Sequence, residues 1–220
     1  AQNNGSALAV GISQYTSDGN GYENAVINLT GYQENKQDGI PYYAKNHLVP
    51  FGEYKPLPFL TAPLYKMMDM PLSDFRKGGG SQSALMMKNQ KVAFNICYED
   101  GFGDELITAA KDATLLANAS NMAWYGKSNA MYQHLQQSQA RAMELGRYMV
   151  RATNTGATAI ISPKGNIIAQ AQPNTETVLE GHIKGYVGET PYMKAGGSWR
   201  LMGILSLTAL LLFIFRNKGH

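Results

Sequence analysis

The clearest alternation of apolar and polar positions covers residues 92–97, where the larger apolar side chains occupy every second position. A period of two predicts a β-strand that runs up to Cys97. Acidic residues and glycines follow at once, so we expect the strand to end there. Asp104 is then expected to cap a short helix over residues 105–113. The pattern therefore places Cys97 at the end of a buried strand, beside the start of a helix.

Other parts of the chain show weaker periodic patterns. Apolar runs predict strands at residues 7–12, 22–29, 114–119, 157–162, 167–172 and 177–183. A helix is predicted over residues 129–148, because apolar side chains recur there near helical spacing. Strand, helix and strand follow one another between residues 92 and 119, which is typical of a βαβ unit. Functional loops then gather at the carboxyl ends of the parallel strands.

The last part of the sequence has a different character, since residues 201–215 carry no charged side chain. A membrane-crossing helix needs roughly 17–25 mostly apolar residues. With Trp199 and Arg200 at the interface, we predict a transmembrane helix over residues 199–216. The alternative is a buried core helix. The basic residues that follow predict a cytoplasmic tail at 217–220, with the domain of residues 1–198 on the opposite side of the membrane.

Composition limits the classes of function that fit. The 220 residues are 44% hydrophobic, which is enough for one substantial core. The net charge of +3 is small and its basic residues are scattered, so no nucleic-acid surface is expected. One cysteine excludes a disulfide framework and a cysteine-based zinc site, and the four histidines show no ligand spacing. We expect no metal and no cofactor. The chain opens close to a core strand, which predicts a missing N-terminal portion.

Four further features bear on possible chemistry. Cys97 is either a rigidly held nucleophile or a small buried apolar residue. Lysine, histidine, proline and glutamate crowd into residues 42–54, which predicts a site or a tight structural junction. The proline-broken apolar segment 56–71 is either folded over the core or used as a lid or membrane-dipping arm. His134 on the long helix is expected to be a hydrogen-bonded structural histidine.

Four polar clusters occur in a fixed order. They are Lys45-x-His47-Leu48-x-Pro50-Phe51-Gly52-Glu53, Cys97-Tyr98-Glu99, Ser120-Asn121-x-x-Trp124-Tyr125-Gly126 and Arg141-Ala142-x-Glu144. Together they resemble the nitrilase (carbon–nitrogen hydrolase) superfamily, and within it the C-terminal portion of the apolipoprotein N-acyltransferase branch. The resemblance implies an α+β fold. It is an α-β-β-α sandwich, here without its first strands, followed by one C-terminal transmembrane helix.

The resemblance also implies a Glu-Lys-Cys triad. Cys97 matches the nucleophile and Lys45 the lysine that stabilises the oxyanion. Glu53 matches a second, supporting glutamate that orients the lysine. Residues that would support the site or contact substrate are Tyr54, Tyr98, Glu99, Asn121 and Trp124. The family's general-base glutamate lies upstream and has no match in this chain, so we expect a fragment that is inactive alone.

The activity implied by the resemblance is acyl transfer. An acyl chain would pass from a membrane phospholipid to the cysteine as a thioester, and then to the N-terminal amine of a diacylglyceryl-cysteine apolipoprotein. The expected location is the bacterial inner membrane, with the main domain on the periplasmic side. Two alternatives stay open. One is a membrane-tethered amidase or nitrilase, and the other is a non-catalytic module that binds lipid or a partner.

Overall fold

The computed structural model describes residues 5–30, 39–57, 59 and 74–218. Most of the apolar segment 56–71 lies outside these residues, as does the end of the expected cytoplasmic tail. The predictions made for them are therefore not tested by the structure.

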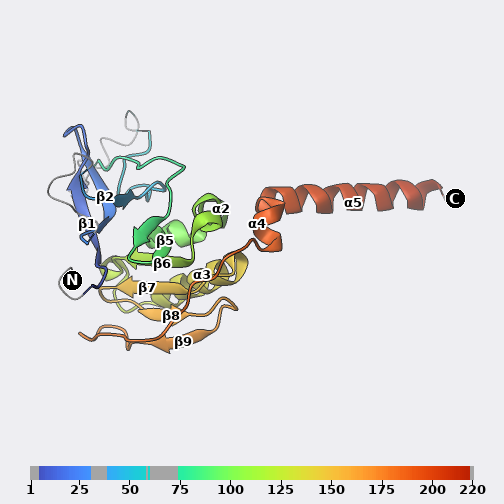
Figure 1. Ribbon diagram of the computed structural model, residues 1–220. Coiled ribbons are helices and arrows are strands. Elements are labelled where there is room, and N and C mark those ends of the chain that lie inside the picture. The colour runs from blue at the N-terminus through green and yellow to red at the C-terminus, as the bar shows by residue number, and fades with distance from the viewer. Residues whose placement is uncertain (1–4, 31–38, 58, 60–73, 219–220) are drawn as a thin grey trace.

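A six-stranded mixed sheet forms the centre of the domain (Figure 1). Its strands, in spatial order, are β4 (Leu85–Met87), β5 (Gln90–Ile96), β6 (Leu115–Ser120), β7 (Met149–Thr153), β8 (Ala159–Ile161) and β9 (Ile167–Gln170). The middle three strands, β5, β6 and β7, run parallel, and the other neighbours are antiparallel. The predicted βαβ unit is confirmed, because helix α2 (Gly103–Asp112) connects β5 to β6.

A second, smaller sheet packs against the first. It contains β1 (Ala9–Tyr15), β2 (Tyr22–Asn28) and β3 (Tyr42–Ala44), all antiparallel. Val26 of β2 packs against Val92, Phe94 and Ile96 of β5. The larger apolar residues of the alternating segment therefore face the small sheet, as their spacing requires.

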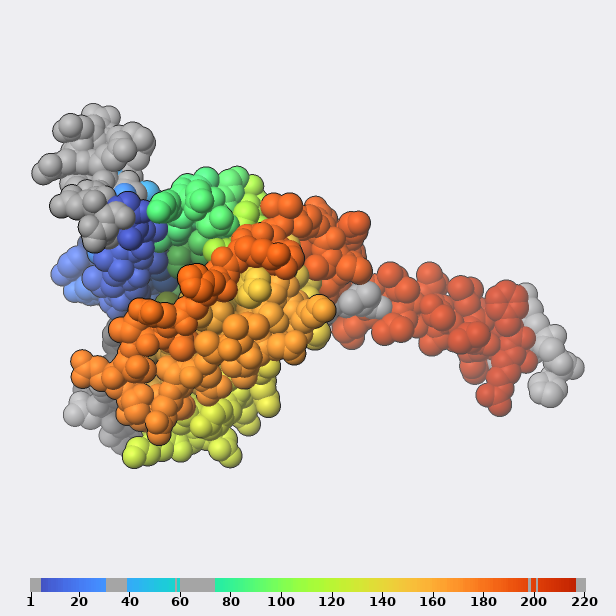
Figure 2. Space-filling view, turned by 60° about the horizontal axis from the view of Figure 1, so that its bottom comes forward, coloured from blue at the N-terminus to red at the C-terminus, as the bar shows by residue number. Residues whose placement is uncertain are grey.

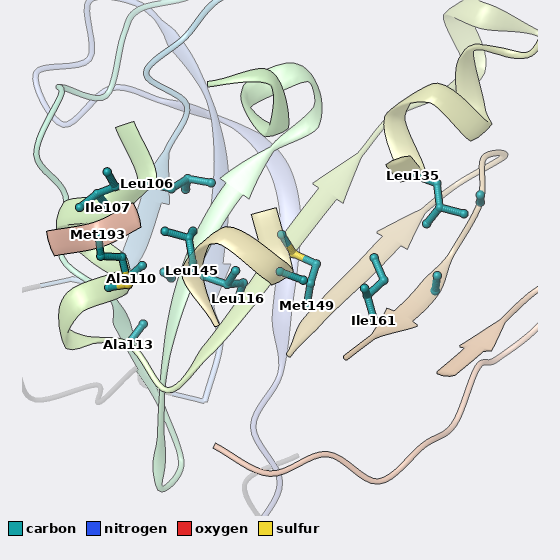
Figure 3. Packing of buried hydrophobic residues seen from close by; sticks show 14 residues of the cluster. Leu106, Ile107, Ala110, Ala113, Leu116, Leu135, Leu145, Met149, Ile161 and Met193 are labelled. Atoms are coloured by element: carbon teal, nitrogen blue, oxygen red, sulfur yellow. The ribbon is translucent and has the colours of Figure 1, made fainter. Parts of the chain in front are cut away.

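The opposite face of the six-stranded sheet is covered by helices. Helix α3 (Ala130–Leu145) and α2 bury Leu106, Ala110 and Leu145 against Leu116 and Met149 of the sheet (Figure 3). Helix α4 (Pro191–Ala195) adds a fully buried methionine, Met193, to the same cluster. Within the described ranges, the chain supplies one helical layer and two sheets, three of the four layers expected.

Several predicted boundaries are wrong. Helix α2 begins at Gly103, directly after the 3-10 turn η2 (Cys97–Gly101), so Asp104 lies inside the helix and does not cap it. Helix α3 ends before residue 148 because Gly146 takes a left-handed φ of 62°. The strand predicted at 177–183 is irregular chain, and Val178 there is 82% exposed. Strands β3, β4 and β7 had not been predicted.

Helix α5 (Ser198–Lys218) leaves the body of the domain, as Figures 1 and 2 show. Two glycines with left-handed φ, Gly196 at 73° and Gly197 at 93°, separate it from α4. Its apolar side chains are exposed, so the alternative of a buried core helix is wrong.

The structure does not support the transmembrane helix predicted over residues 199–216. Among the helices that the structure describes, none combines the length and the apolar character needed to cross a membrane.

Candidate active site

Cys97 stands where β5 turns into the 3-10 turn η2. Its φ of 56° is left-handed, a conformation that residues other than glycine rarely adopt. Such a conformation costs on the order of 1–3 kcal/mol and persists only where the surroundings enforce it. The side chain is partly buried. The turn thus holds the only cysteine in a fixed direction at the carboxyl edge of the parallel strands.

Lys45 and Glu53 form a second fixed unit in the loop after β3. Lys45 is 1% exposed, and its Nζ lies 2.8 and 2.7 Å from the two Glu53 carboxylate oxygens. The same carboxylate accepts a hydrogen bond from the Val49 backbone N–H at 2.7 Å and another from the Asn24 side chain. Glu53 is therefore held from three directions, and it fixes the position of the lysine ammonium.

The Lys45 ammonium changes the pKa of the Cys97 thiol. Burial raises the pKa of Cys97 above its ordinary value, and the charge of Lys45 is the largest opposing influence. A hydrogen bond from the Tyr98 backbone N–H lowers the pKa of the thiol as well, while Glu53 raises it. The structure thus brings Cys97, Lys45 and Glu53 into one electrostatically connected group, although they come from different sheets and loops.

Glu99 joins these two units. Its Oε1 accepts hydrogen bonds from the Asn46 and His47 backbone N–H groups at 2.7 and 2.9 Å. Its Oε2 accepts from the Ile96 N–H at 2.7 Å and from the Tyr43 hydroxyl at 3.0 Å. Burial raises the pKa of Glu99, and the backbone hydrogen bonds oppose that shift. One carboxylate therefore ties the loop of Lys45 to the end of the strand that carries Cys97.

We expect Glu99→Gln to lower the free energy of unfolding by about 2–3 kcal/mol. The amide NH₂ would face backbone N–H donors, and a buried donor without a partner costs about 1–3 kcal/mol. Urea unfolding measures the loss. Glu105→Gln is the matched control, because Glu105 is 40% exposed and pairs with His47 at 3.0 Å. Equal losses in the two variants would contradict the role assigned to Glu99.

Aromatic rings surround the joined loops. The His47 ring stacks on Phe102 with centroids 3.5 Å apart, and Tyr98 meets Phe102 edge-on at 5.0 Å. Tyr54 is close enough to Tyr98 to raise its pKa, although burial is the larger cause. Tyr54 thus lies near Tyr98, and Phe102, which the sequence analysis does not name, contacts both His47 and Tyr98.

The loop after β6 contributes the third cluster. The Asn121 side-chain oxygen accepts from the Ala123 N–H at 3.1 Å and from the Asn154 amide at 2.8 Å, which shapes the turn η3 (Ala123–Tyr125). Trp124 on this turn is 80% exposed. Burial raises the pKa of Tyr125, and Cys97 is the next cause. Tyr125 therefore lies close enough to Cys97 for the thiol to raise its pKa. The sequence analysis names its neighbour Trp124 instead.

Comparison with known proteins places the chain in a family. The sequence model described as Carbon-nitrogen hydrolase matches residues 1–192. This chain belongs to the carbon–nitrogen hydrolase family.

Curated relatives of this carbon–nitrogen hydrolase chain share one name. "Apolipoprotein N-acyltransferase" of Neisseria meningitidis serogroup B is 94% identical over 220 residues, which are 100% of this chain and 43% of the relative. The protein of that name from Chromobacterium violaceum is 53% identical over 217 residues, covering 98% of this chain and 41% of its own. The chain thus spans less than half the length of these relatives.

Solved structures share the fold of this carbon–nitrogen hydrolase chain. A carbon-nitrogen hydrolase from Helicobacter pylori G27 superposes with a TM-score of 0.57 at 15% identity, covering 80% of this chain and 61% of that one. Saccharomyces cerevisiae Nit3, a member of branch 10 of the nitrilase superfamily, gives a TM-score of 0.54 at 17% identity, covering 77% of this chain and 57% of its own. At these identities the likeness concerns the fold alone.

A buried histidine lies beside the site of this carbon–nitrogen hydrolase chain. His134 of α3 is buried next to the Tyr125 ring, with centroids 5.6 Å apart. Its Nδ1 has no hydrogen-bond partner among the described atoms, so the expected hydrogen-bonded histidine is wrong at that nitrogen. Burial lowers its pKa, and the charges of Arg151 and Lys45 add to the effect.

Across the described part of the chain, no group of three His, Cys, Asp or Glu residues is placed to hold a metal ion.

Proposed function

We propose that this chain carries the acyl-transfer site of an apolipoprotein N-acyltransferase. Cys97 would take an acyl chain from a phospholipid as a thioester and pass it to the N-terminal amine of a diacylglyceryl-cysteine apolipoprotein. The observation that carries the proposal is the Lys45 ammonium, which both Glu53 oxygens hold within electrostatic reach of the thiol. The shared name of the curated relatives supports the choice of substrates.

In the first half-reaction, a base takes the thiol proton and the thiolate attacks the ester carbonyl carbon, forming a C–S bond. The Lys45 ammonium and the Tyr98 backbone N–H are the donors for the resulting oxyanion. When the tetrahedral intermediate collapses, the C–O bond to the glycerol breaks. The departing alkoxide takes the proton from the base and leaves as a lysophospholipid.

In the second half-reaction, the neutral amine of the apolipoprotein attacks the thioester carbonyl. A C–N bond forms, the C–S bond breaks, and the amine's surplus proton passes to the base and then to the sulfur. We assign the base to a glutamate that is not among these 220 residues, as the family resemblance implies. The chain alone is therefore expected to be inactive, and tests of transfer use it joined to the rest of the Neisseria relative.

We place this site at the periplasmic face of the bacterial inner membrane. Both substrates are lipids, and each presents its reacting group at the bilayer surface. The bacterial sources of the curated relatives and their name support this location.

A membrane-tethered amidase is the second candidate, because the family and its solved relatives include carbon–nitrogen hydrolases. The two functions differ in the species formed on the cysteine. A fluorescent phospholipid, labelled in its acyl chain, is expected to label Cys97 through a bond that neutral hydroxylamine cleaves. Intact peptides analysed by mass spectrometry locate the label. Rapid turnover of small amides without phospholipid labelling would replace the acyltransferase proposal by the amidase.

A further inference from the structure

A buried polar network lies beneath the turn that carries Cys97. Arg151 of β7 is 1% exposed, and its Nη1 donates to Asp100 Oδ2 and to Asn118 Oδ1, each at 2.8 Å. The same nitrogen lies 2.9 Å from the Ser138 hydroxyl, which in turn donates to Asp100. Residues from η2, β6, β7 and α3 thus converge on one guanidinium group.

Asn118 connects this network to the nucleophile. Its Oδ1 accepts from Arg151 and from the Ser120 hydroxyl at 2.5 Å, so two donors define which end of the amide is oxygen. The Nδ2 group therefore points the other way and donates to the Asn95 side-chain oxygen and to the Cys97 backbone oxygen, the latter at 3.1 Å. Cys97 has a left-handed φ of 56°, and this hydrogen bond is one of the contacts that hold its peptide in place.

A contribution to stability is a weak explanation for this arrangement. Asp100 and Arg151 are an ion pair with 0% side-chain exposure. Replacing such a buried pair by well-packed apolar residues is often neutral or stabilising, because removing two charges from water is costly. Asp100 Oδ1 and Arg151 Nε have no hydrogen-bond partner in the described part of the molecule, so the pair is not even fully satisfied. A role in presenting the neighbouring nucleophile explains why the charges are there.

We propose that Arg151 is a positioning residue for Cys97. Through Asn118 it fixes the Cys97 carbonyl group, and with it the direction in which the sulfur meets an acyl carbonyl. Its guanidinium is also a second positive charge near the thiolate, in addition to Lys45. This inference rests on the proposed role of Cys97 as the nucleophile.

The thiol's pKa supplies a direct readout. Arg151 lowers it, although burial, Lys45, Tyr98 and Glu53 have larger effects. The groups around the thiol come from several elements. Lys45 and Glu53 from the loop after β3, Tyr98 from η2, Tyr125 from η3 and Arg151 from β7 interact with the thiol itself. Three further titratable groups lie next to these: Glu99 and Asp100 from η2 and His134 from α3.

The test is alkylation of the full chain by iodoacetamide between pH 6 and pH 11, followed by mass spectrometry. Cys97 is the only cysteine, so the rate reports on it alone. We expect Arg151→Met to raise the midpoint and to slow alkylation at pH 7.5, because the Arg151 charge lowers the pKa of the thiol. Arg151→Lys keeps the charge and is expected to recover part of the rate.

Arg147→Met is the matched control. Arg147 is 2% exposed, and its guanidinium donates to backbone oxygens, including those of Ala113 at 2.9 Å and Gly188 at 2.7 Å. Its loss is expected to lower the melting temperature and leave the alkylation midpoint unchanged. An unchanged midpoint in Arg151→Met, or an equal shift in Arg147→Met, overturns the proposal.

If Arg151→Met fails to melt cooperatively, Asn118→Leu decides the question. Leucine is close to asparagine in size, adds no charge beside the thiol and removes the donor to the Cys97 oxygen. Slower alkylation on the plateau above the midpoint supports the proposal, and an unchanged plateau rate overturns it. Alkylation needs no acyl donor, so these outcomes are separate from failure of the proposed function. That failure appears as the absence of a hydroxylamine-sensitive label on Cys97.

Discussion

Replacement of Cys97 by alanine is expected to reduce acyl transfer to the uncatalysed background, a loss of at least about a thousandfold. The reason is that no other group in the described site is placed to carry the acyl chain. Cys97→Ser is expected to fall nearly as far. A serine hydroxyl ionises far less readily than a thiol, and the partly buried turn disfavours an anion. Both variants are measured in the chain joined to the rest of the Neisseria relative, with acylation of a lipoprotein peptide as the assay.

The control for the cysteine variants is the cooperative melting of each protein, since alanine and serine fit the space of the thiol. If Cys97→Ala acylates the peptide at the original rate, the non-catalytic alternative is correct. The chain would then bind lipid or a partner without taking part in the chemistry.

Lys45→Met is expected to lower the acylation rate about a hundredfold to a thousandfold. Loss of one oxyanion donor costs about 2.7–4 kcal/mol in an enclosed site. The pH profile is expected to move as well. The Lys45 charge lowers the pKa of Cys97, so its removal raises that pKa further, and the rising limb of activity shifts to higher pH. Rates measured from pH 6 to pH 10 test both effects.

Two variants separate the charge of Lys45 from its packing. Lys91→Met is the matched control, because Lys91 is 40% exposed and pairs with Asp112 at 2.6 Å, and we expect near-normal activity. Lys45→Met with Glu53→Gln removes the unpaired carboxylate that the single change leaves behind. The double variant is expected to regain stability but not rate. Recovery of the rate would show that Lys45 acts only through folding.

The sequence predicted the local parts of the site well. Alternation located β5, and the acidic and glycine residues after Cys97 marked the turn. The motif around Lys45 and Glu53 identified two residues that the structure joins by a bidentate ion pair. These are short-range signals, because the apolar period, the turn residues and the motif spacing each depend on only a few consecutive residues.

The long-range parts were not predictable in the same way. Arg151, Asp100 and Asn118 are far apart in sequence, and only the parallel register of β5, β6 and β7 brings them under the cysteine. The sequence did not single out Tyr125, although Cys97 raises its pKa, because the direction of each side chain in a 3-10 turn depends on the packing around the turn. The strand predicted at 177–183 is irregular chain, because a short apolar run alone does not provide a neighbouring strand to pair with.

The pair of glycines between α4 and α5 determines where the last helix points. Met193 is locked in the core, so α4 does not turn with respect to the domain. A β-carbon at Gly197 would come within 2.4 Å of the Asp104 carboxylate, and one at Gly196 within 3.0 Å of Arg200. The direction of α5 relative to α4 therefore depends on the absence of a β-carbon at Gly196 and Gly197. A larger residue at either position requires these side chains or the direction of α5 to change, while the six-stranded sheet does not contact the two glycines.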